Sequence, residues 1–174
     1  FGSMVSGDMG ELAEIIRQAV KLSGVRAVVA LGWGQQEAKT KDANIFYVKS
    51  VPHDWLFPHM AGAVHHGGAG TTATSLRHAL PTLVVPFGGD QPFWAERVYA
   101  AGCGPKAIPR DKLTAENLAE GLRALISNPE YTRNAACIGE ALRNEHGCAN
   151  AADLIEKAVW NWENGNPAQD GMNI

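Results

Sequence analysis

The sequence predicts an α/β protein, with a Rossmann-like parallel sheet and helices on both of its faces. Short apolar stretches typical of strands alternate with helical patterns about six times along the chain. One stretch, "TLVVPF" at residues 82–87, is continuously apolar, as expected for a strand buried on both faces. A chain of 174 residues suits one such domain.

The first half of the chain follows this alternation. Residues 12–20 carry apolar side chains at helical spacing, and Gly24 marks the end of that helix. The stretches "VRAVVALGW" and "ANIFYVKS" follow as strands, and "HDWLFPHM" as a loop with one helical turn, broken at Pro58. "AGAVHH" is the next strand, and the helix after it ends at Pro81.

In the second half, "TLVVPF" leads to a helix that begins near Gln91, and "CGPKAIP" at residues 103–109 returns to strand. Thr114 is expected to cap the helix "AENLAEGLRALI", and Asn128 with Pro129 to start the next one. Asn150 is expected to cap the last helix, "AADLIEKAVWNW". We expect one domain over residues 1–165, with its first strand truncated, and a polar tail over residues 166–174.

Composition narrows the function classes. The chain is 45% apolar with a formal net charge of -3, which indicates a globular protein and gives no basic excess for nucleic acid. No apolar run is long enough to span a membrane, and the opening "FGSMVSGDMG" has no signal-peptide pattern. That opening reads as the end of a strand, so we expect the N-terminal part of the protein to be absent. The three cysteines lack metal-like spacing, which favours free thiols in the cytoplasm.

The stretch "AVHHGGAGTT" at residues 63–72 is the strongest candidate binding site. It joins a strand to a helix, and ligands of open α/β sheets bind where strands end. The glycines Gly68 and Gly70 allow close approach to the backbone, and a helix N-terminus attracts anions. Thr71 adds a hydroxyl. Because His65 and His66 are adjacent on a strand they face opposite sides, so we expect His66 in the site and His65 in the packing.

Two other interpretations of this turn stay open at this point. The glycines and histidines could serve only a tight strand-to-helix connection. Alternatively, Gly68-x-Gly70-x-x-Ala73, with Asp90 twenty residues after Gly70, fits a loose dinucleotide fingerprint. That fingerprint normally follows the first strand of its unit, whereas several strands precede this one. The opposed histidines also disfavour a metal site, so we expect no metal.

Two further segments lie at strand ends. Asp90 and Gln91 follow the strand "TLVVPF", and a carboxylate beside an amide suits the hydroxyls of a sugar. Asp90 as a simple helix cap is the alternative. The segment "HDWL" offers Trp55 and backbone groups to a flat base, and Trp33 lies at another strand end, although a tryptophan taken alone more often belongs to the core.

Taken together, these segments resemble the C-terminal half of a GT-B glycosyltransferase. The similarity runs through "FGSMV", "LGWG", "VPHDWLFPHMAGAVHHGGAGTT", "ALPTLVVPFGGDQPFWAERV" and "GCGPKAIPRDKLTAENLAEGL", over about residues 1–160. Within that class the chain is most similar to the sterol 3-beta-glucosyltransferases. Any one motif is weakly specific, whereas the ordered combination is highly specific.

The resemblance implies a role for each motif in binding UDP-glucose. It places the diphosphate on Ser3, His66, Gly68, Gly70 and Thr71. It places the uracil on the loop residues His53, Asp54, Trp55 and Leu56, and the sugar on Asp90 and Gln91. Many plant relatives carry a Glu for the ribose soon after the glycine turn, where this chain has Thr72, Ala73 and Thr74, so ribose recognition stays unassigned.

The resemblance also implies an inverting, metal-independent transfer of glucose from UDP-glucose to a lipid hydroxyl, by analogy a sterol. The catalytic base and the acceptor pocket belong to the N-terminal domain in this family, so this fragment is expected to bind donor and to be inactive alone. Peripheral membrane association is an expectation for the full-length protein only. Other UDP-sugar chemistry, such as epimerisation, and a non-catalytic nucleotide-binding module are the alternatives.

Overall fold

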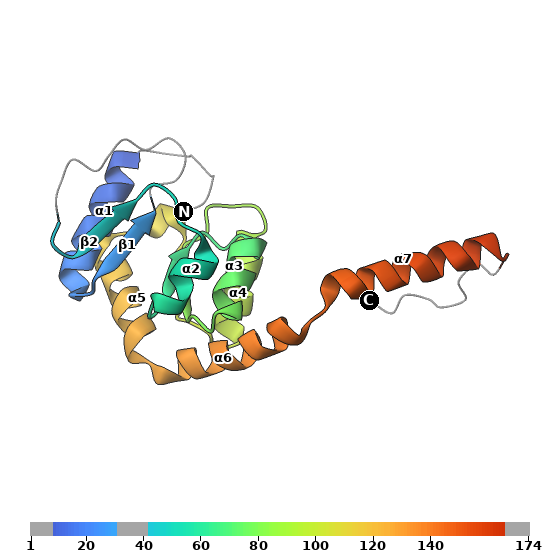
Figure 1. Cartoon of the computed structure of the whole chain (residues 1–174). Coiled ribbons are helices and arrows are strands. Elements are labelled where there is room, and N and C mark those ends of the chain that lie inside the picture. Colours follow the sequence, from blue (N-terminus) through green and yellow to red (C-terminus); the bar gives the residue numbers. More distant parts are fainter. Residues whose placement is uncertain (1–8, 31–41, 166–174) are drawn as a thin grey trace. The chain divides into compact units, whose positions relative to one another are not determined.

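The structure is a computed structural model that describes residues 9–30 and 42–165. The chain divides into two compact units, residues 1–142 and residues 143–174, and each is described by itself (Figure 1). Within the described residues, no helix combines the length and apolar character that crossing a membrane requires. The prediction of one domain over residues 1–165 stays a prediction.

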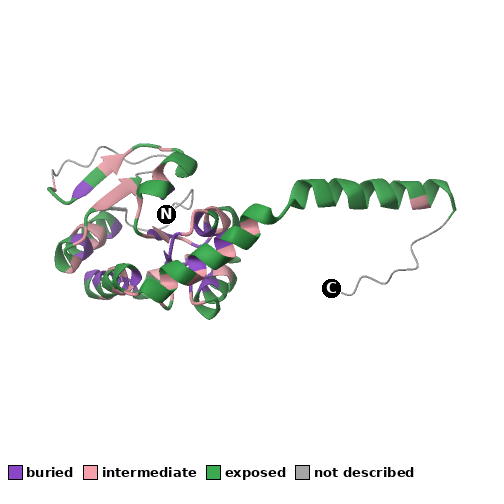
Figure 2. Ribbon diagram, turned by 60° about the horizontal axis from the view of Figure 1, so that its bottom comes forward, coloured by how far each residue is buried: buried purple, intermediate pink, exposed green. Residues whose placement is uncertain are grey.

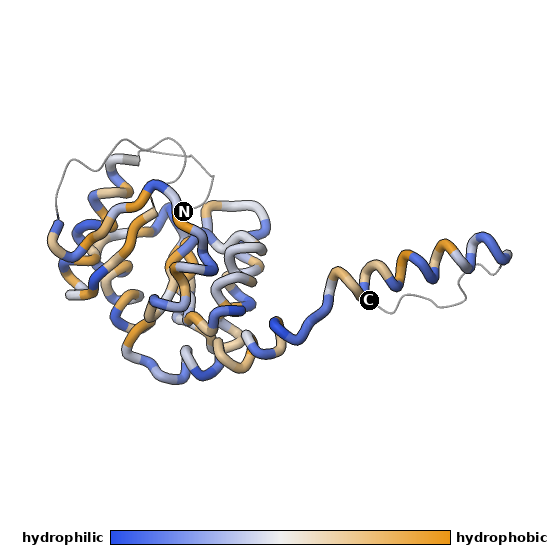
Figure 3. The backbone as a smooth tube through the Cα atoms, viewed as in Figure 1, coloured by the Kyte–Doolittle hydropathy of each residue, from blue (hydrophilic) through white to orange (hydrophobic). Residues whose placement is uncertain are grey.

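The first unit opens with a helix and a pair of parallel strands. Helix α1 (Met9–Ser23) ends at Gly24, whose φ of 73° is the left-handed conformation expected of a helix stop. Strand β1 (Ala27–Ala30) pairs in parallel with β2 (Ile45–Val48), from Ala27 opposite Ile45 to Ala30 opposite Val48. The apolar runs of both strands stand out in Figure 3. These elements lie where the sequence predicts them.

A second parallel pair carries the candidate site. Strand β3 (Ala63–His65) runs through helix α3 (Ala69–Arg77) to β4 (Thr82–Val84), with Ala63 opposite Thr82 and His65 opposite Val84. All three residues of β4 are buried, as its continuously apolar sequence predicts. Because the two strands are parallel, their carboxyl ends lie at the same edge. The described strands form two separate parallel pairs.

The remaining helices of the first unit complete its layers. Helix α5 packs against α1, where Arg123 Nη1 donates to the carbonyl of Leu22 at 3.1 Å, and α3 packs against α4 (Figure 1). Thr114 and Asn117 form a reciprocal capping box at the start of α5, which confirms the predicted cap. The bounds of these elements are α2 (His53–Leu56), η1 (Phe57–His59), α4 (Gln91–Ala100), η2 (Arg110–Lys112), α5 (Ala115–Ser127) and α6 (Pro129–Asn144).

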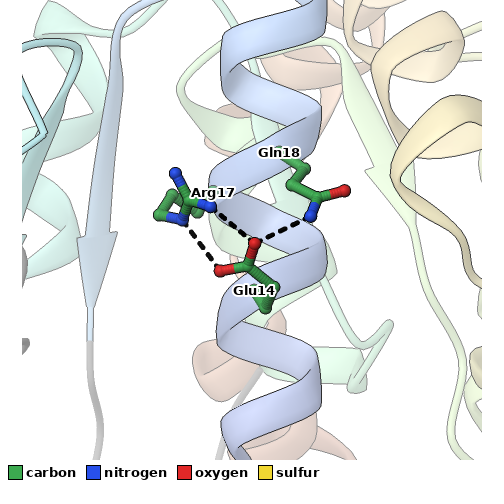
Figure 4. A network of polar contacts seen from close by, with 3 residues as sticks. All are labelled: Glu14, Arg17 and Gln18. Atoms are coloured by element: carbon green, nitrogen blue, oxygen red, sulfur yellow. Dashed lines mark hydrogen bonds and ion pairs between the residues drawn. The ribbon is translucent and has the colours of Figure 1, made fainter.

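The core lies between the strands and the buried faces of the helices (Figure 2). Its largest cluster joins Leu83 of β4 to Leu118 and Leu125 of α5 and to Leu12 of α1. By contrast, the exposed face of α1 carries an ion-pair network, in which Glu14 accepts hydrogen bonds from Arg17 and Gln18 (Figure 4). These bonds lower the pKa of Glu14 to about 2. Contacts of this kind at helical spacing support an exposed helix.

Two sequence predictions are wrong. Residues 103–109 form no strand, although the amides of Ile108 and Arg110 donate to the carbonyls of Val84 and Pro86 at 3.1 and 3.0 Å. The rings of Pro105 and Pro109 hold φ at about −65°, whereas a parallel strand needs about −120°, so the segment does not take strand geometry beside β4.

Asn150 does not cap the last helix. Helix α7 (Gly147–Glu163) starts four residues earlier than expected, with His146 at the N-cap position, and the amide of Asn150 donates to His146 O at 2.9 Å. No residue of α7 whose burial is described is buried (Figure 2), and its exposed apolar residues are Leu154, Ile155, Val159, Trp160 and Trp162.

Candidate functional site

The turn after β3 can be built only from glycine at its centre. Gly67 has a φ of 92°, a region that favours glycine. A Cβ at this position would lie 2.6 Å from Val84 Cγ1 and 3.2 Å from the carbonyl oxygen of Gln91. The turn after β3 therefore packs directly against β4 and the start of α4. The two strand-end segments that the sequence singled out are neighbours in the fold.

Helix α3 begins immediately after this turn. Gly68 is its N-cap residue, and the first intrahelical bond runs from Thr72 N to Gly68 O at 2.9 Å. The amides of Ala69, Gly70 and Thr71 precede that bond, so they have no carbonyl partner within the helix. A Cβ at Gly70 would meet nothing within 4 Å. The first turn of α3 thus carries three such amide donors and the positive end of the helix dipole, and the side-chain position of Gly70 faces open space.

His66 lies over the start of α3. Its half-buried ring approaches Gly68 so closely that a Cβ there would lie 2.6 Å from His66 Nε2. Burial lowers the pKa of His66, and the nearby carboxylate of Asp90 opposes that shift. His66 Nδ1 is buried and has no hydrogen-bond partner among the residues that the structure describes. Burial at the start of α3 therefore favours the neutral form of the His66 imidazole.

His65 lies in the core, as expected from the strand alternation. It is 5% exposed, and its Nδ1 accepts a hydrogen bond from the amide of Gly67 at 3.0 Å. Burial lowers its pKa to about 3. The sequence predicted the burial of His65 but missed its bond to the glycine turn, which no motif signals.

Asp90 and Gln91 begin α4 with different environments. Gln91 is 5% exposed, and its Oε1 accepts from the amides of Phe87 and Gly88 at 2.7 and 3.3 Å, so it holds the loop after β4. Asp90 is exposed and occupies the N-cap position, but within the described chain its carboxylate makes no capping bond. Instead Asp90 Oδ2 accepts from Trp94 Nε1 at 2.8 Å. Sequence reasoning missed Trp94, although its i+4 spacing on a helix could have signalled the pair.

The predicted uracil-binding segment forms a single helical turn, α2, as expected. His53 stacks on the buried ring of Phe57 with a centroid distance of 4.6 Å, while Asp54 Oδ1 faces His78 Nε2 at 3.7 Å. Trp55 is 64% exposed, and Leu56 packs with Phe57. Phe57 therefore anchors a turn whose first three side chains reach solvent.

The structure brings two of the predicted site segments together, because the turn after β3 contacts the start of α4. The contacts of α2 run instead to His78, at the C-terminal end of α3. Ser3 and Trp33 lie outside the described residues. No group of three or more potential metal ligands is found among residues 9–30 and 42–165.

The family comparison decides the assignment. A family model described as "Erythromycin biosynthesis protein CIII-like, C-terminal domain" matches residues 14–156. The chain belongs to this family. As an EryCIII-like C-terminal domain, the chain is 42% identical over 159 residues to sterol 3-beta-glucosyltransferase UGT80B1 of Arabidopsis thaliana. That alignment covers 90% of this chain and 26% of the relative, so the EryCIII-like domain spans about a quarter of that protein's length.

Solved structures agree with this assignment. The EryCIII-like domain is similar to the glycotransferase of kitacinnamycin, with a TM-score of 0.74, 25% identity, and coverage of 90% of this chain and 41% of that chain. It is also similar to glycosyltransferase VinC, solved in complex with DTDP, with a TM-score of 0.66, 28% identity, and coverage of 74% and 33%. The resemblance to the C-terminal half of a GT-B glycosyltransferase, and with it the Rossmann-like α/β class, is confirmed.

Proposed function

We propose that this EryCIII-like domain binds UDP-glucose for an inverting, metal-independent transfer of glucose to a lipid hydroxyl, with a sterol as the acceptor. The observation that carries the proposal is the turn of residues 66–68 at the open N-terminus of α3, in a chain whose relatives include sterol 3-beta-glucosyltransferases. Backbone amides at such a helix start bind phosphate groups readily.

The roles proposed for the residues follow from their chemistry. The amides of Gly70 and Thr71 would donate to the diphosphate, and His66 would donate a further hydrogen bond. As the bond to the sugar breaks, negative charge grows on the leaving UDP, and these donors would stabilise it without a divalent cation. Gly68 leaves room for the ring of His66. Ser3 remains a proposed diphosphate ligand on the resemblance alone.

The sugar and the base would be bound on either side of the diphosphate. Asp90 offers an exposed carboxylate to the sugar hydroxyls. Gln91 stays a proposed sugar ligand, although its Oε1 already accepts two backbone hydrogen bonds. The exposed turn of His53, Asp54, Trp55 and Leu56 would frame the uracil. We propose that the base that deprotonates the acceptor lies elsewhere in the full protein, so that this chain alone binds donor and transfers nothing.

A nucleotide panel tests the proposal. The melting temperature of the chain is measured with UDP, UDP-glucose, UDP-GlcNAc, dTDP and NAD, each in a chelator and in magnesium. We expect UDP and UDP-glucose to raise the melting temperature equally well in both media, and NAD to leave it unchanged. A shift seen only in magnesium would refute metal independence, and stabilisation by NAD alone would refute the donor assignment.

A further inference from the structure

The hydrogen bond from Gly67 to His65 defines the tautomer of a buried histidine. His65 Nδ1 accepts the amide proton of Gly67 at 3.0 Å, and the bond lies in the core. An imidazole nitrogen that accepts must carry a free lone pair, so in the neutral ring the proton sits on Nε2. No described residue accepts a hydrogen bond from this Nε2.

This hydrogen bond restrains Gly67, the residue at the centre of the turn after β3. The amide of Gly67 is bonded to the ring of His65, and Val84 Cγ1 and the carbonyl oxygen of Gln91 close off the position that a Cβ of Gly67 would take. Its amide is therefore engaged with the protein and is turned away from any ligand. Gly68, the next residue, is the N-cap of α3, so the orientation of the Gly67 peptide determines where the first amides of α3 point.

We propose that His65 is a positioning residue of the diphosphate site, in which Nδ1 holds the Gly67 amide and thereby aims the first-turn amides of α3 at the ligand. The proposal rests on the proposed function, because it assumes that the first turn of α3 binds the diphosphate. It assigns separate tasks to the adjacent histidines, since His66 would touch the ligand and His65 would act through the backbone.

The buried setting keeps this bond in place. A protonated His65 would present an N–H to the Gly67 amide, so the hydrogen bond would be lost. Burial disfavours that charged form, and so do the neighbouring rings of His66 and His53, which together lower the pKa of His65 to about 3. His65 is therefore a neutral acceptor over the whole range in which the protein would bind a nucleotide.

Three substitutions separate the acceptor from the bulk of the ring. In His65→Asn, Oδ1 can take the place of Nδ1, whereas in His65→Gln the amide group extends to the position of Nε2. His65→Leu fills similar space with no acceptor. Leu83→Ala is the control, because Leu83 is fully buried in the adjacent strand and is not among the atoms nearest to the Cβ position of Gly67.

Affinities for UDP, inorganic pyrophosphate and uridine are measured on each folded variant, well below its melting temperature. We expect His65→Leu and His65→Gln to weaken UDP and pyrophosphate about tenfold, the factor that matches one lost hydrogen bond. His65→Asn should stay within about threefold of wild type, because it keeps the acceptor. Uridine should bind all variants alike, and Leu83→Ala should melt earlier with unchanged affinities.

Nuclear magnetic resonance of the wild-type chain keeps the proposal testable if the variants do not fold. We expect the ring nitrogens of His65 to report the Nε2–H tautomer, and the amide of Gly67 to exchange slowly with solvent. The proposal would be overturned by the Nδ1–H tautomer of His65 or by rapid exchange of the Gly67 amide with solvent. Equal affinity losses in His65→Asn and His65→Leu would also overturn it. If wild type binds neither UDP nor pyrophosphate, the proposed function fails, and the positioning of a diphosphate site fails with it, whatever the tautomer.

Discussion

At the scale of single residues, His66 is the histidine that reaches the start of α3, because the strand alternation turns His65 into the core. We predict that His66→Ala weakens UDP by about 1–3 kcal/mol, the range for hydrogen bonds to charged groups. Isothermal titration calorimetry of the variant and wild type measures the difference. An unchanged affinity would mean that His66 does not face the ligand.

Asp90 should separate recognition of the sugar from recognition of the nucleotide. If its carboxylate accepts from glucose hydroxyls, Asp90→Ala removes contacts that UDP never makes. We predict that the affinity for UDP-glucose falls about tenfold to a hundredfold, while the affinity for UDP changes much less. Calorimetry with both ligands measures the ratio. Loss of stability with an unchanged ratio would leave Asp90 with only a structural role at the start of α4.

Trp94 offers a finer test of the same carboxylate. Its Nε1–H donates a hydrogen bond to Asp90 Oδ2, with 2.8 Å between the two atoms. Trp94→Phe removes this donor and keeps an aromatic ring at the position. We predict that UDP-glucose weakens by about 0.5–1.5 kcal/mol, the usual net contribution of one hydrogen bond, and that UDP is unaffected. Calorimetric titration of UDP-glucose into Trp94→Phe, Asp90→Ala and the double variant measures the coupling energy between the two residues. Effects that simply add in the double variant would contradict the pairing.

At the scale of elements, a substitution at Gly70 in the first turn of α3 separates effects on stability from effects on UDP affinity. A Cβ there meets nothing within 4 Å, and alanine suits a helix better than glycine. We predict that Gly70→Ala leaves the free energy of unfolding unchanged or raises it by up to about 1 kcal/mol, yet weakens UDP. Denaturant unfolding and calorimetry measure the two quantities.

Gly67→Ala is the matched comparison, because its Cβ would lie 2.6 Å from Val84 Cγ1 at a φ of 92°. That variant should lose stability whether or not a ligand binds. If Gly70→Ala binds UDP as tightly as wild type does, the diphosphate does not approach Gly70.

Two local chemical signals marked helix ends correctly, whereas Asn150 as a cap and the strand at residues 103–109 were wrong. Gly24 ends α1, and the capping box of Thr114 with Asn117 starts α5, because each signal acts within one turn of backbone. The apolar stretch at residues 103–109 suggested a strand. The segment lies beside β4 and donates to it from Ile108 and Arg110, but its two prolines hold φ away from the value of a parallel strand.

At the scale of the whole molecule, the buried neutral His65 makes stability depend on pH. Its ordinary pKa of 6.5 falls to about 3 in the folded protein, so between these values the unfolded chain binds a proton that the folded chain does not. The free energy of unfolding therefore falls with acidification across this window, by up to about 1.4 kcal/mol per pH unit from this group.

Denaturant unfolding at several pH values from 7 to 4 measures this dependence. His65→Asn is the matched control, because it keeps an acceptor for Gly67 and does not titrate. We predict that its free energy of unfolding falls less steeply below pH 6.5 than that of wild type. Parallel curves for the two proteins would show that His65 is not buried in the neutral form.

The sequence by itself determined the α/β class and the family, and it singled out the segments of the candidate site. Those rest on patterns that the chain carries locally: alternating apolar segments, a glycine turn before a helix, and acidic and amide groups after a buried strand. Only the tertiary structure decided which groups these residues engage. Gln91 holds the loop of Phe87 and Gly88, and His65 holds Gly67. Such hydrogen bonds depend on side-chain direction and on the burial that excludes water, and both are set by how β3, β4 and α4 pack together.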